Sequence, residues 1–453
     1  MSINPFKRKI YDRLLKWKTE RQGQSAILIQ GARRVGKSTI VEQFARQEYE
    51  SYILIDFSKC SQEVFNLFSD ISDLDYVFMR LQLAYGVSLH ERNSVIVFDE
   101  VQRQPLARQA IKHLVADGRY DYIETGSLVS INKNVKDILI PSEERRIKMY
   151  PMDFEEFLWA LGDEMMMPFI KNCFEKKRPL GPVHAKAMDY FRKYLLIGGM
   201  PQVVKNFVEH RDFRKVDREK RMILDLYRQD IEKHADRLEK KVKSIFDTIP
   251  AELQRHEKKF RLADLEKNAK FRSYESSFVW LDEARVVNLC FAATEPNVGL
   301  GLKMDHMRVK CYFADTGLLV SHAFDENELM DNNLYQKLLL DKLEINKGML
   351  VENIVAQMLT AAGHKLYFFS NASRDDAEDR MEIDFLVRKP QITSRHNISP
   401  IEVKSGAGYS LSSLTKCINK YSPYLSTPYV LHSAAYKEEG KITYLPLYMT
   451  PLL

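Results

Sequence analysis

The sequence lacks the features that mark secreted and membrane-spanning proteins. Its 453 residues include only five cysteines, at positions 60, 173, 290, 311 and 417, and no two have the spacing of a zinc-ligand pair. Reduced thiols are therefore expected. No apolar run approaches the roughly 20 residues that span a bilayer. The basic N-terminal stretch MSINPFKRKIYDRLL has no apolar segment of the secretory-signal type. We expect a cytoplasmic protein with no membrane partner.

The balance of basic and acidic residues excludes few classes of protein. There are 68 basic and 62 acidic residues, which gives a formal net charge of +6. This small excess permits contact with nucleic acid but does not require it, because an ordinary basic protein would show the same balance. Hydrophobic residues make up 45% and charged residues 29%, a composition typical of soluble globular proteins. The length predicts about three domains of ordinary size.

The segment QGARRVGKST contains the pattern G-x-x-x-x-G-K-[ST] between an apolar strand-like run and a helical pattern. Its glycines let the backbone curl so that successive N–H groups point at a triphosphate, and the following helix adds the positive end of its dipole. We expect Lys37 to reach the β- and γ-phosphates and Ser38 to ligate Mg²⁺. The loop residues predicted to bind ATP are Gly31, Ala32, Arg33, Arg34, Val35, Gly36, Lys37, Ser38 and Thr39.

The segment SVIVFDE supplies the second half of an ATPase site. Four apolar residues are followed by Asp99 and Glu100. A buried parallel strand places acids at its C-terminal end beside the phosphate-binding loop. We expect Asp99 to hold Mg²⁺, directly or through water, and Glu100 to polarise the attacking water. Glu100 and Lys37 are therefore the predicted catalytic residues, and ATP and Mg²⁺ are the expected ligands.

Two further segments complete the expected nucleotide domain. Residues 63–85 have a helical pattern, and residues 120–127 read as a strand that ends in small polar side chains. At the tip of that strand, Thr125 and Ser127 are predicted to contact the γ-phosphate and report hydrolysis. A plain strand-to-loop turn explains the same residues equally well.

The motifs GARRVGKST, VIVFDEVQ, ETGSL, MYPMDFEEFLWALG, GGMPQVV, CYFADTGLL, EIDFLV and IEVKSG occur in this order. In them the chain resembles a group of prokaryotic AAA-type P-loop ATPases that carry an uncharacterised C-terminal domain similar to the PD-(D/E)XK restriction-endonuclease fold. The resemblance covers nearly the whole chain. It implies an α/β fold with an ATPase core of parallel strands at residues 1–150, a helical lid at 151–225, a winged-helix segment at 226–320 and a nuclease-like domain at 321–453.

The resemblance also bears on assembly. AAA-type enzymes usually supply an arginine finger from a neighbouring subunit, so a homo-oligomer is expected. Arg145 and Arg146, in PSEERRIKMYP, are near where such a residue would fall. Solvated charges on a loop are the alternative interpretation.

The lid is expected to begin with a capped helix, because Glu156 follows Asp153 at the spacing of a capping box. Residues 195–202 contain two glycines and a proline and predict a tight turn. The resemblance supports a position for this turn near the ATP site but assigns it no chemistry.

The winged helix is predicted from three helical patterns and two strand-like segments, at residues 242–253, 261–268, 273–285, 286–294 and 307–313. Lys267, Lys270, Arg272 and Tyr274 surround the start of the third helix, where such folds often read DNA. A module that contacts protein, or one that only packs, is the alternative.

The C-terminal domain carries a second candidate site. Asp384 lies in the strand-like EIDFLV, and PIEVK carries Glu402 and Lys404, which are two apart and so point to one face of a strand. An acid followed by E-x-K is the core of the PD-(D/E)XK pattern, and Glu352 from a helix completes the site in related folds. These acids would bind a second divalent metal ion that activates water, and Lys404 would position or deprotonate that water. Many relatives of such folds have lost cleavage and keep binding, so both outcomes remain open.

Three functions are compatible with these patterns. The first is an ATPase in which hydrolysis moves the appended domains. The second is an ATP-regulated, metal-dependent nuclease or a protein that binds DNA or RNA. The third is a nucleotide-gated adaptor with little turnover. The presence of Glu100 favours hydrolysis.

Overall fold

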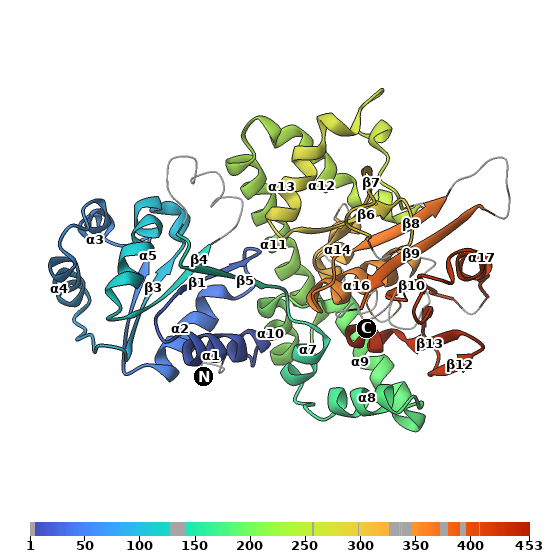
Figure 1. Ribbon diagram of the computed structural model, residues 1–453, viewed down its shortest axis with the longest axis horizontal. Coiled ribbons are helices and arrows are strands. Elements are labelled where there is room, and N and C mark those ends of the chain that lie inside the picture. Colours follow the sequence, from blue (N-terminus) through green and yellow to red (C-terminus); the bar gives the residue numbers. More distant parts are fainter. Residues whose placement is uncertain are drawn as a thin grey trace. The chain divides into compact units, whose positions relative to one another are not determined.

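The computed structural model describes residues 5–126, 141–255, 258–297, 299–325, 335, 337, 347–371, 379–389, 396–406 and 408–453. The chain divides into an N-terminal unit, Met1–Pro151, and a C-terminal unit, Met152–Leu453, and each contains one sheet (Figure 1). All five cysteines are free thiols, as expected. Among the described residues, no helix has the length and apolar character to cross a membrane.

A five-stranded parallel sheet forms the core of the N-terminal unit. Its strands are β1 (Ala26–Gly31), β2 (Ser51–Asp56), β3 (Ser94–Asp99), β4 (Asp121–Gly126) and β5 (Glu144–Met149). Their order across the sheet is β2-β3-β4-β1-β5, and every neighbouring pair is parallel. The strand with the P-loop and the strand with the acidic pair are therefore separated by β4, and all three end at the same edge.

Helices cover both faces of this sheet (Figure 1). They are α1 (Lys9–Arg21), α2 (Lys37–Glu48), α3 (Gln62–Asn66), α4 (Leu74–Tyr85) and α5 (Pro105–Asp117). Side chains alternate along β1, so that Ala26 and Leu28 pack with α4 and α5 while Ile27 and Ile29 pack with α1 and α2. Burial on both faces explains why the strands are almost continuously apolar, as expected for a doubly wound α/β core.

The helix predicted for residues 63–85 is two helices. α3 ends at Asn66, a short 3-10 turn follows, and α4 begins at Leu74. Asp73 is the N-cap of α4, because its Oδ1 accepts a hydrogen bond from the Tyr76 N–H at 3.0 Å. A short acidic side chain that bonds the backbone in this way favours a new N-terminus over a continuing helix.

The C-terminal unit contains the remaining elements. Its helices are α7 (Phe154–Ala160), α8 (Met166–Glu175), α9 (His184–Ile197), α10 (Pro201–His210), α11 (Phe213–His234), α12 (Glu239–Gln254), α13 (Glu275–Glu283), α14 (Thr316–Ala323), α16 (Lys347–Ala361) and α17 (Ser412–Tyr421). Its strands are β6 (Val287–Ala293), β7 (Met304–Phe313), β8 (Tyr367–Asn371), β9 (Met381–Arg388), β10 (Ile398–Val403), β11 (Tyr429–His432), β12 (Lys437–Glu439) and β13 (Ile442–Pro446).

These strands form one mixed sheet in the order β12-β13-β11-β10-β9-β8-β6-β7. The hairpin β6–β7, predicted as the wing of a winged helix, is thus the edge of the sheet that also holds the predicted nuclease-like strands. β6 pairs with β8 in parallel, from Phe291 opposite Tyr367 to Ala293 opposite Phe369. The domain boundaries at 225 and 320 remain predictions, and this pairing runs across the second of them.

The second helix predicted for the winged-helix segment is absent. Residues 261–268 contain only a 3-10 turn at Leu262–Asp264. The Arg261 N–H donates to Glu252 Oε2 at 2.7 Å, and Asn268 has a left-handed backbone with φ of 67°, so the chain turns instead of continuing a helix. Tyr274 is buried and donates to Glu266 Oε2 at 3.0 Å, which contradicts its predicted contact with DNA.

The capping box predicted for the lid is confirmed. Asp153 Oδ1 accepts from the Glu156 N–H at 2.9 Å, and Glu156 Oε2 accepts from the Asp153 N–H at 3.1 Å. The turn predicted in residues 195–202 is also present, since Gly198 has a left-handed φ of 83°. Its position near the ATP site stays a prediction.

That turn packs against the start of α14. The Gly199 N–H donates to Asp315 Oδ2 at 2.6 Å. A Cβ on Gly198 would lie 2.1 Å from Asp315 Oδ1, and a Cβ on Gly317 would lie 2.2 Å from the Ile197 carbonyl oxygen. Glycine is therefore required on both sides of this contact. The motifs GGMPQVV and CYFADTGLL, far apart in sequence, meet here.

A buried charge cluster joins α5 to the N-terminal sheet. Glu144 accepts a bidentate pair of bonds from Arg108 Nε and Nη2, at 2.7 and 2.9 Å, and a third from Arg146 Nε at 2.8 Å. Glu124 is fully buried beside Glu144. Burial, and then the negative charge of Glu144, raise the pKa of Glu124 well above its ordinary range. Glu124 therefore keeps its proton when the chain folds.

Glu124→Gln is expected to stabilise the protein increasingly as pH rises. The folded carboxyl holds a proton that the unfolded one releases above its ordinary pKa of about 4.3. Between that pH and the raised folded pKa, the wild-type free energy of unfolding falls by about 1.4 kcal/mol per pH unit from this group. Glutamine does not titrate and removes this slope. The calorimetric melting temperature of Glu124→Gln should therefore rise increasingly above that of wild type from about pH 5 to about pH 8.

The exposed acid Glu20, which pairs with Lys16 on the surface of α1, offers the control. Glu20→Gln is expected to change the melting temperature little at any pH. A difference between Glu124→Gln and wild type that stays constant across this pH range would contradict the protonated state of Glu124.

Candidate nucleotide-binding site

The phosphate-binding loop connects the end of β1 to the start of α2. Gly36 is the residue before α2 and has a left-handed backbone with φ of 97°, while Arg34 has φ of 67°. These two conformations curl the loop between Gly31 and Lys37. A Cβ on Gly31 would lie 2.5 Å from the Met149 carbonyl oxygen, so this position admits only glycine.

Two basic side chains hold the loop from inside. Lys37 Nζ donates to the carbonyl oxygens of Gly31 and Ala32, at 3.0 and 3.1 Å. Arg8, only 7% exposed, donates from Nη1 to the Val35 carbonyl oxygen at 3.1 Å and from Nη2 to that of Tyr150 at 2.7 Å. Arg8 was not predicted from the sequence. Its one signal is a basic residue just before the first helix, which is too common to single it out.

On the acidic side of the site, two hydroxyl groups donate hydrogen bonds to one carboxylate oxygen. Ser38 Oγ, at the start of α2, donates to Asp99 Oδ1 at 2.9 Å. Thr125 Oγ1, at the end of β4, donates to the same oxygen. The Glu100 N–H donates to Thr125 Oγ1 at 3.4 Å. The structure therefore brings together Lys37, Ser38, Asp99, Glu100 and Thr125 as the sequence predicted.

Glu100 has an unusual backbone. Its φ of 56° and ψ of 44° lie in the left-handed region, directly after the last residue of β3. A non-glycine residue held there carries strain that the surrounding structure has to support, and such residues cluster at functional sites. Gln102 Nε2 donates to Glu100 Oε2 at 2.5 Å and orients the carboxylate.

The donor set fits a magnesium–triphosphate complex. Two adjacent oxygen ligands of octahedral Mg²⁺, each about 2.05 Å from the ion, lie about 2.9 Å apart. Ser38 Oγ and Asp99 Oδ1 have this separation. The helix that begins at Lys37 has 12 residues, and its N-terminal N–H groups favour a phosphate at this end.

Other predicted residues are less informative. Ser127 lies outside the described residues. Arg33 is exposed on the loop, and Thr39 is exposed in the first turn of α2. Arg145 and Arg146 lie on β5, an edge strand of the sheet, and not on a loop. Their role as an arginine finger remains a prediction.

The second candidate site is a cavity of about 400 Å³ in the C-terminal unit, and Glu352, Asp384, Glu402 and Lys404 all line it. The sequence therefore identified residues that come together. Lysines accompany each acid, however. Lys258 Nζ lies 2.5 Å from Glu352 Oε2, and Lys404 Nζ lies 2.5 Å from Glu402 Oε2.

The predicted second metal site is not supported. Within the described residues, no three acidic, histidine or cysteine side chains are arranged to hold a metal ion. Burial would raise the pKa of Glu352, but Lys310 and Lys258 outweigh it and lower that pKa to about 2. Burial, and then Asp384, raise the pKa of Glu402 to about 8. Lysine ammonium groups thus surround the acids.

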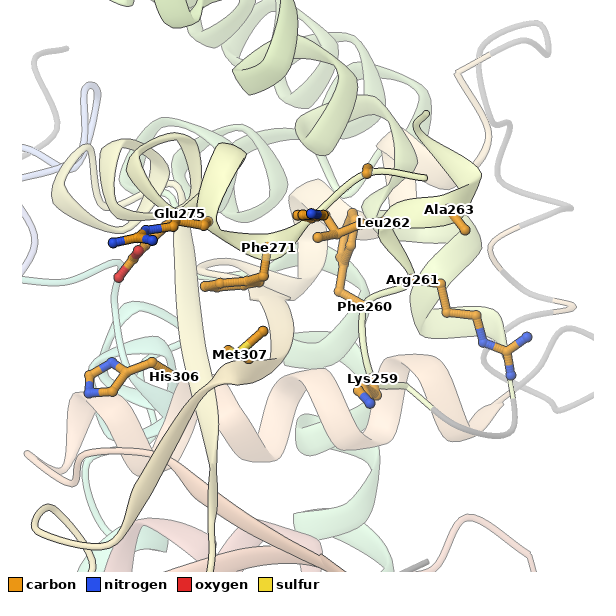
Figure 2. A pocket seen from close by; sticks show the side chains of 12 residues that line it. Lys259, Phe260, Arg261, Leu262, Ala263, Phe271, Glu275, His306 and Met307 are labelled. Carbon is orange, nitrogen blue, oxygen red and sulfur yellow. The ribbon is translucent and has the colours of Figure 1, made fainter. Parts of the chain in front are cut away.

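A larger opening, of about 960 Å³, lies in the predicted winged-helix segment (Figure 2). Four of the five formal charges on its lining are positive: Lys259, Arg261, Lys270 and Arg272, against Glu275. Figure 2 shows Phe271 close to Met307, with His306 and Lys259 on opposite sides of them. Phe260 and Phe271 are buried, whereas the four basic residues are exposed, so the opening combines an apolar floor with a basic rim.

Comparison with family models identifies the N-terminal domain. Residues 23–158 match the model of an AAA domain. Residues 188–328 match a domain of unknown function (DUF8612), and residues 347–449 match a second one (DUF4143). With the parallel sheet and the P-loop geometry, the first match shows that this part of the chain is similar to an AAA-type P-loop domain. The resemblance found in the sequence is confirmed for this domain.

Solved structures give weak similarities. The Walker-type ATPase PABY2304 of Pyrococcus abyssi is 16% identical, with 70% of this chain and 95% of that chain covered and a TM-score of 0.41. Drosophila ORC bound to DNA is 14% identical (66% and 90% covered, TM-score 0.26). The Aeropyrum pernix ORC1 protein in complex with DNA is 12% identical (72% and 93% covered, TM-score 0.28). These scores are too low to support an inference. No curated protein matches the chain.

Arg8→Leu is expected to destabilise the N-terminal unit and weaken nucleotide binding. The change removes two hydrogen bonds from a buried guanidinium to the backbone, and a charged hydrogen bond contributes about 1.5–3 kcal/mol. Both the melting temperature and the affinity for a fluorescent ATP analogue report the loss.

Arg13→Leu is the matched control, because Arg13 Nη1 contacts the Lys148 carbonyl oxygen at 3.4 Å on the surface. Its melting temperature should stay near that of wild type. Equal effects of the two changes would mean that Arg8 does not hold the loop.

Proposed function

We propose that the N-terminal unit binds ATP with Mg²⁺ and hydrolyses the γ-phosphate bond. The convergence of Ser38 and Thr125 on one oxygen of Asp99, facing the loop of Lys37, carries this proposal. These groups come from three elements at one edge of a parallel sheet, where α/β proteins bind their ligands.

Each residue has a distinct task in this proposal. Lys37, with the loop N–H groups, binds the β- and γ-phosphates, and it exchanges its bonds to Gly31 and Ala32 for the phosphate oxygens. Ser38 and Asp99 hold Mg²⁺, which neutralises charge on the phosphates. Glu100, oriented by Gln102, accepts a proton from the attacking water.

Thr125 is the predicted sensor in this arrangement. Its hydroxyl donates to Asp99 and accepts from the Glu100 N–H, so it contacts both acids. A change at the γ-phosphate that moves either acid would therefore reach β4. We propose that such movements drive the appended parts of the chain, namely the lid at 151–225, the winged-helix segment at 226–320 and the C-terminal domain at 321–453, within a homo-oligomer.

Phosphate release by the purified full-length protein tests the main proposal. Lys37→Ala and Glu100→Gln should each reduce turnover at least about 10²-fold, because each removes a group that acts on the transferring phosphoryl or its nucleophile. The two should differ in binding. Lys37→Ala is expected to lose affinity for ATP, whereas Glu100→Gln is expected to retain it.

Glu42→Gln is a control for the loss of a carboxylate, because the Glu42 side chain on α2 is half-exposed and pairs only with Arg46 at 2.8 Å among the contacts described. Its turnover should match wild type. Unchanged turnover in Glu100→Gln would refute the role of Glu100. Tight ATP binding by wild type without phosphate release would favour the nucleotide-gated adaptor.

A second function, binding of nucleic acid, is favoured by the opening shown in Figure 2. Its positive rim suits a phosphate backbone, and its apolar floor suits a base or sugar. Lys270 and Arg272 were predicted from sequence to contact DNA, and both line this opening. Lys267 was predicted with them and does not line it.

The double change Lys270→Glu, Arg272→Glu should weaken binding of labelled single- and double-stranded DNA, measured by fluorescence anisotropy. The slope of log affinity against log salt should fall by about one for each lost phosphate contact. Lys267→Glu, in the same segment but outside the opening, should change affinity much less. Equal losses in the two variants would argue against the opening, and wild-type protein that binds neither DNA nor RNA would favour a protein-contact module.

A further inference from the structure

Lys310 is a buried cation surrounded by acids. It lies on β7, and its side chain is 1% exposed. Its Nζ lies 3.0 Å from Glu382 Oε1, 3.3 Å from Glu352 Oε1 and 3.9 Å from Asp384 Oδ1. The carboxylates come from α16 and β9. A buried ammonium is stable only where such partners replace its water.

The same carboxylates would be the ligands of a metal ion in this pocket. Mg²⁺ and Mn²⁺ take carboxylate oxygens at short range and therefore gather acids around one point. Here Lys310 Nζ occupies that point. An ammonium group and a metal ion cannot share it, because both are cations and the acids close around a single centre.

The charges of the pocket balance without a metal ion. Its acids and bases are Glu352, Glu382, Asp384 and Glu402 against Arg255, Lys258, Lys310 and Lys404. A divalent ion would add two positive charges to a set whose formal charges already cancel.

Glu402 strengthens this conclusion. Its Oε2 pairs with Lys404 at 2.5 Å, while its Oε1 is buried and has no hydrogen-bond partner in the described part of the chain. The cation beside Glu402 is thus the Lys404 ammonium group. The fourth acid of the pocket therefore has an ammonium partner of its own.

We propose that the ammonium group of Lys310 takes the place of the divalent metal ion in this pocket, so that the C-terminal unit binds no Mg²⁺ or Mn²⁺ there and cuts no phosphodiester. The pocket then joins α16, β7 and β9 through the ion pairs of Lys310. Because all of these residues lie in the C-terminal unit, the proposal is independent of ATP hydrolysis.

Titration of the nucleotide-free, full-length protein with Mn²⁺, followed by electron paramagnetic resonance, tests the proposal. Wild type should show no Mn²⁺ site that depends on Asp384. Lys310→Ala, which removes the ammonium group, should gain one such site and lose it again in Lys310→Ala, Asp384→Asn. The control Lys220→Ala removes another fully buried lysine, whose Nζ donates to the Leu196 carbonyl oxygen at 3.0 Å, and should gain none.

Stability provides a second measurement. Lys310→Ala leaves buried acids without their counter-ion, so its melting temperature should fall and should recover when Mn²⁺ is added. Lys220→Ala should show no such recovery. If Lys310→Ala does not fold alone, refolding it with and without Mn²⁺ makes the same comparison.

Two results would overturn the proposal. One is Mn²⁺ binding by wild type that is lost in Asp384→Asn. The other is a Lys310→Ala protein that gains neither an Asp384-dependent Mn²⁺ site nor any stability from Mn²⁺. A nuclease assay of wild type with Mn²⁺ supplements the binding measurement. Cleavage that requires Asp384 would show that a metal ion, and not the Lys310 ammonium group, occupies the pocket.

Discussion

The hydrogen bond from Ser38 Oγ to Asp99 Oδ1 fixes the geometry on which the N-terminal unit depends. It connects the first turn of α2 to the last residue of β3, although another strand lies between β3 and the loop strand. This is possible because parallel strands end at one edge and β4 contributes a short side chain there, Thr125, which bonds the same oxygen. A bulky residue at the end of β4 would keep the two halves of the site apart.

Buried charge is compensated in two ways in this protein. Beside Glu144, the cations Arg108 and Arg146 already bond that carboxylate, so Glu124 gains no counter-ion and retains a proton. Around Lys310 the acids outnumber the lysine. Burial lowers its pKa, but these carboxylates outweigh burial and keep it charged. The identity of the neighbours, and not burial itself, decides which state is present.

Much of this architecture follows from local signals in the sequence. The P-loop, the acidic strand end and the capping box at Asp153 are short patterns whose chemistry requires nearby residues, and each is present. The nuclease-like residues were also brought together. The helix predicted at 261–268 was wrong because Glu252, nine residues before Arg261, bonds its backbone and favours a turn.

Single residues that act across long separations had no such signal. Arg8 reaches Tyr150, 142 residues away, and Lys310 reaches Glu352, 42 residues away. Neither belongs to a repeated spacing, and a lone basic residue in a sequence is most often a solvated surface charge. Their roles depend on the fold that surrounds them, so they become visible only when the strands and helices are assembled.

The contact of the turn at Gly198 with Asp315 and Gly317 has a mechanical consequence. There is no spare volume between the two segments, since a single added methyl group would overlap an oxygen on either side. α9, α10 and α14 are therefore coupled as one rigid block, even though the chain passes through more than a hundred residues between its ends. A truncated chain that stopped at residue 225 would lose Asp315 and Gly317, which contact the turn at Gly198. Any movement of the C-terminal unit that involves these helices therefore has to bend the chain at a position outside this block.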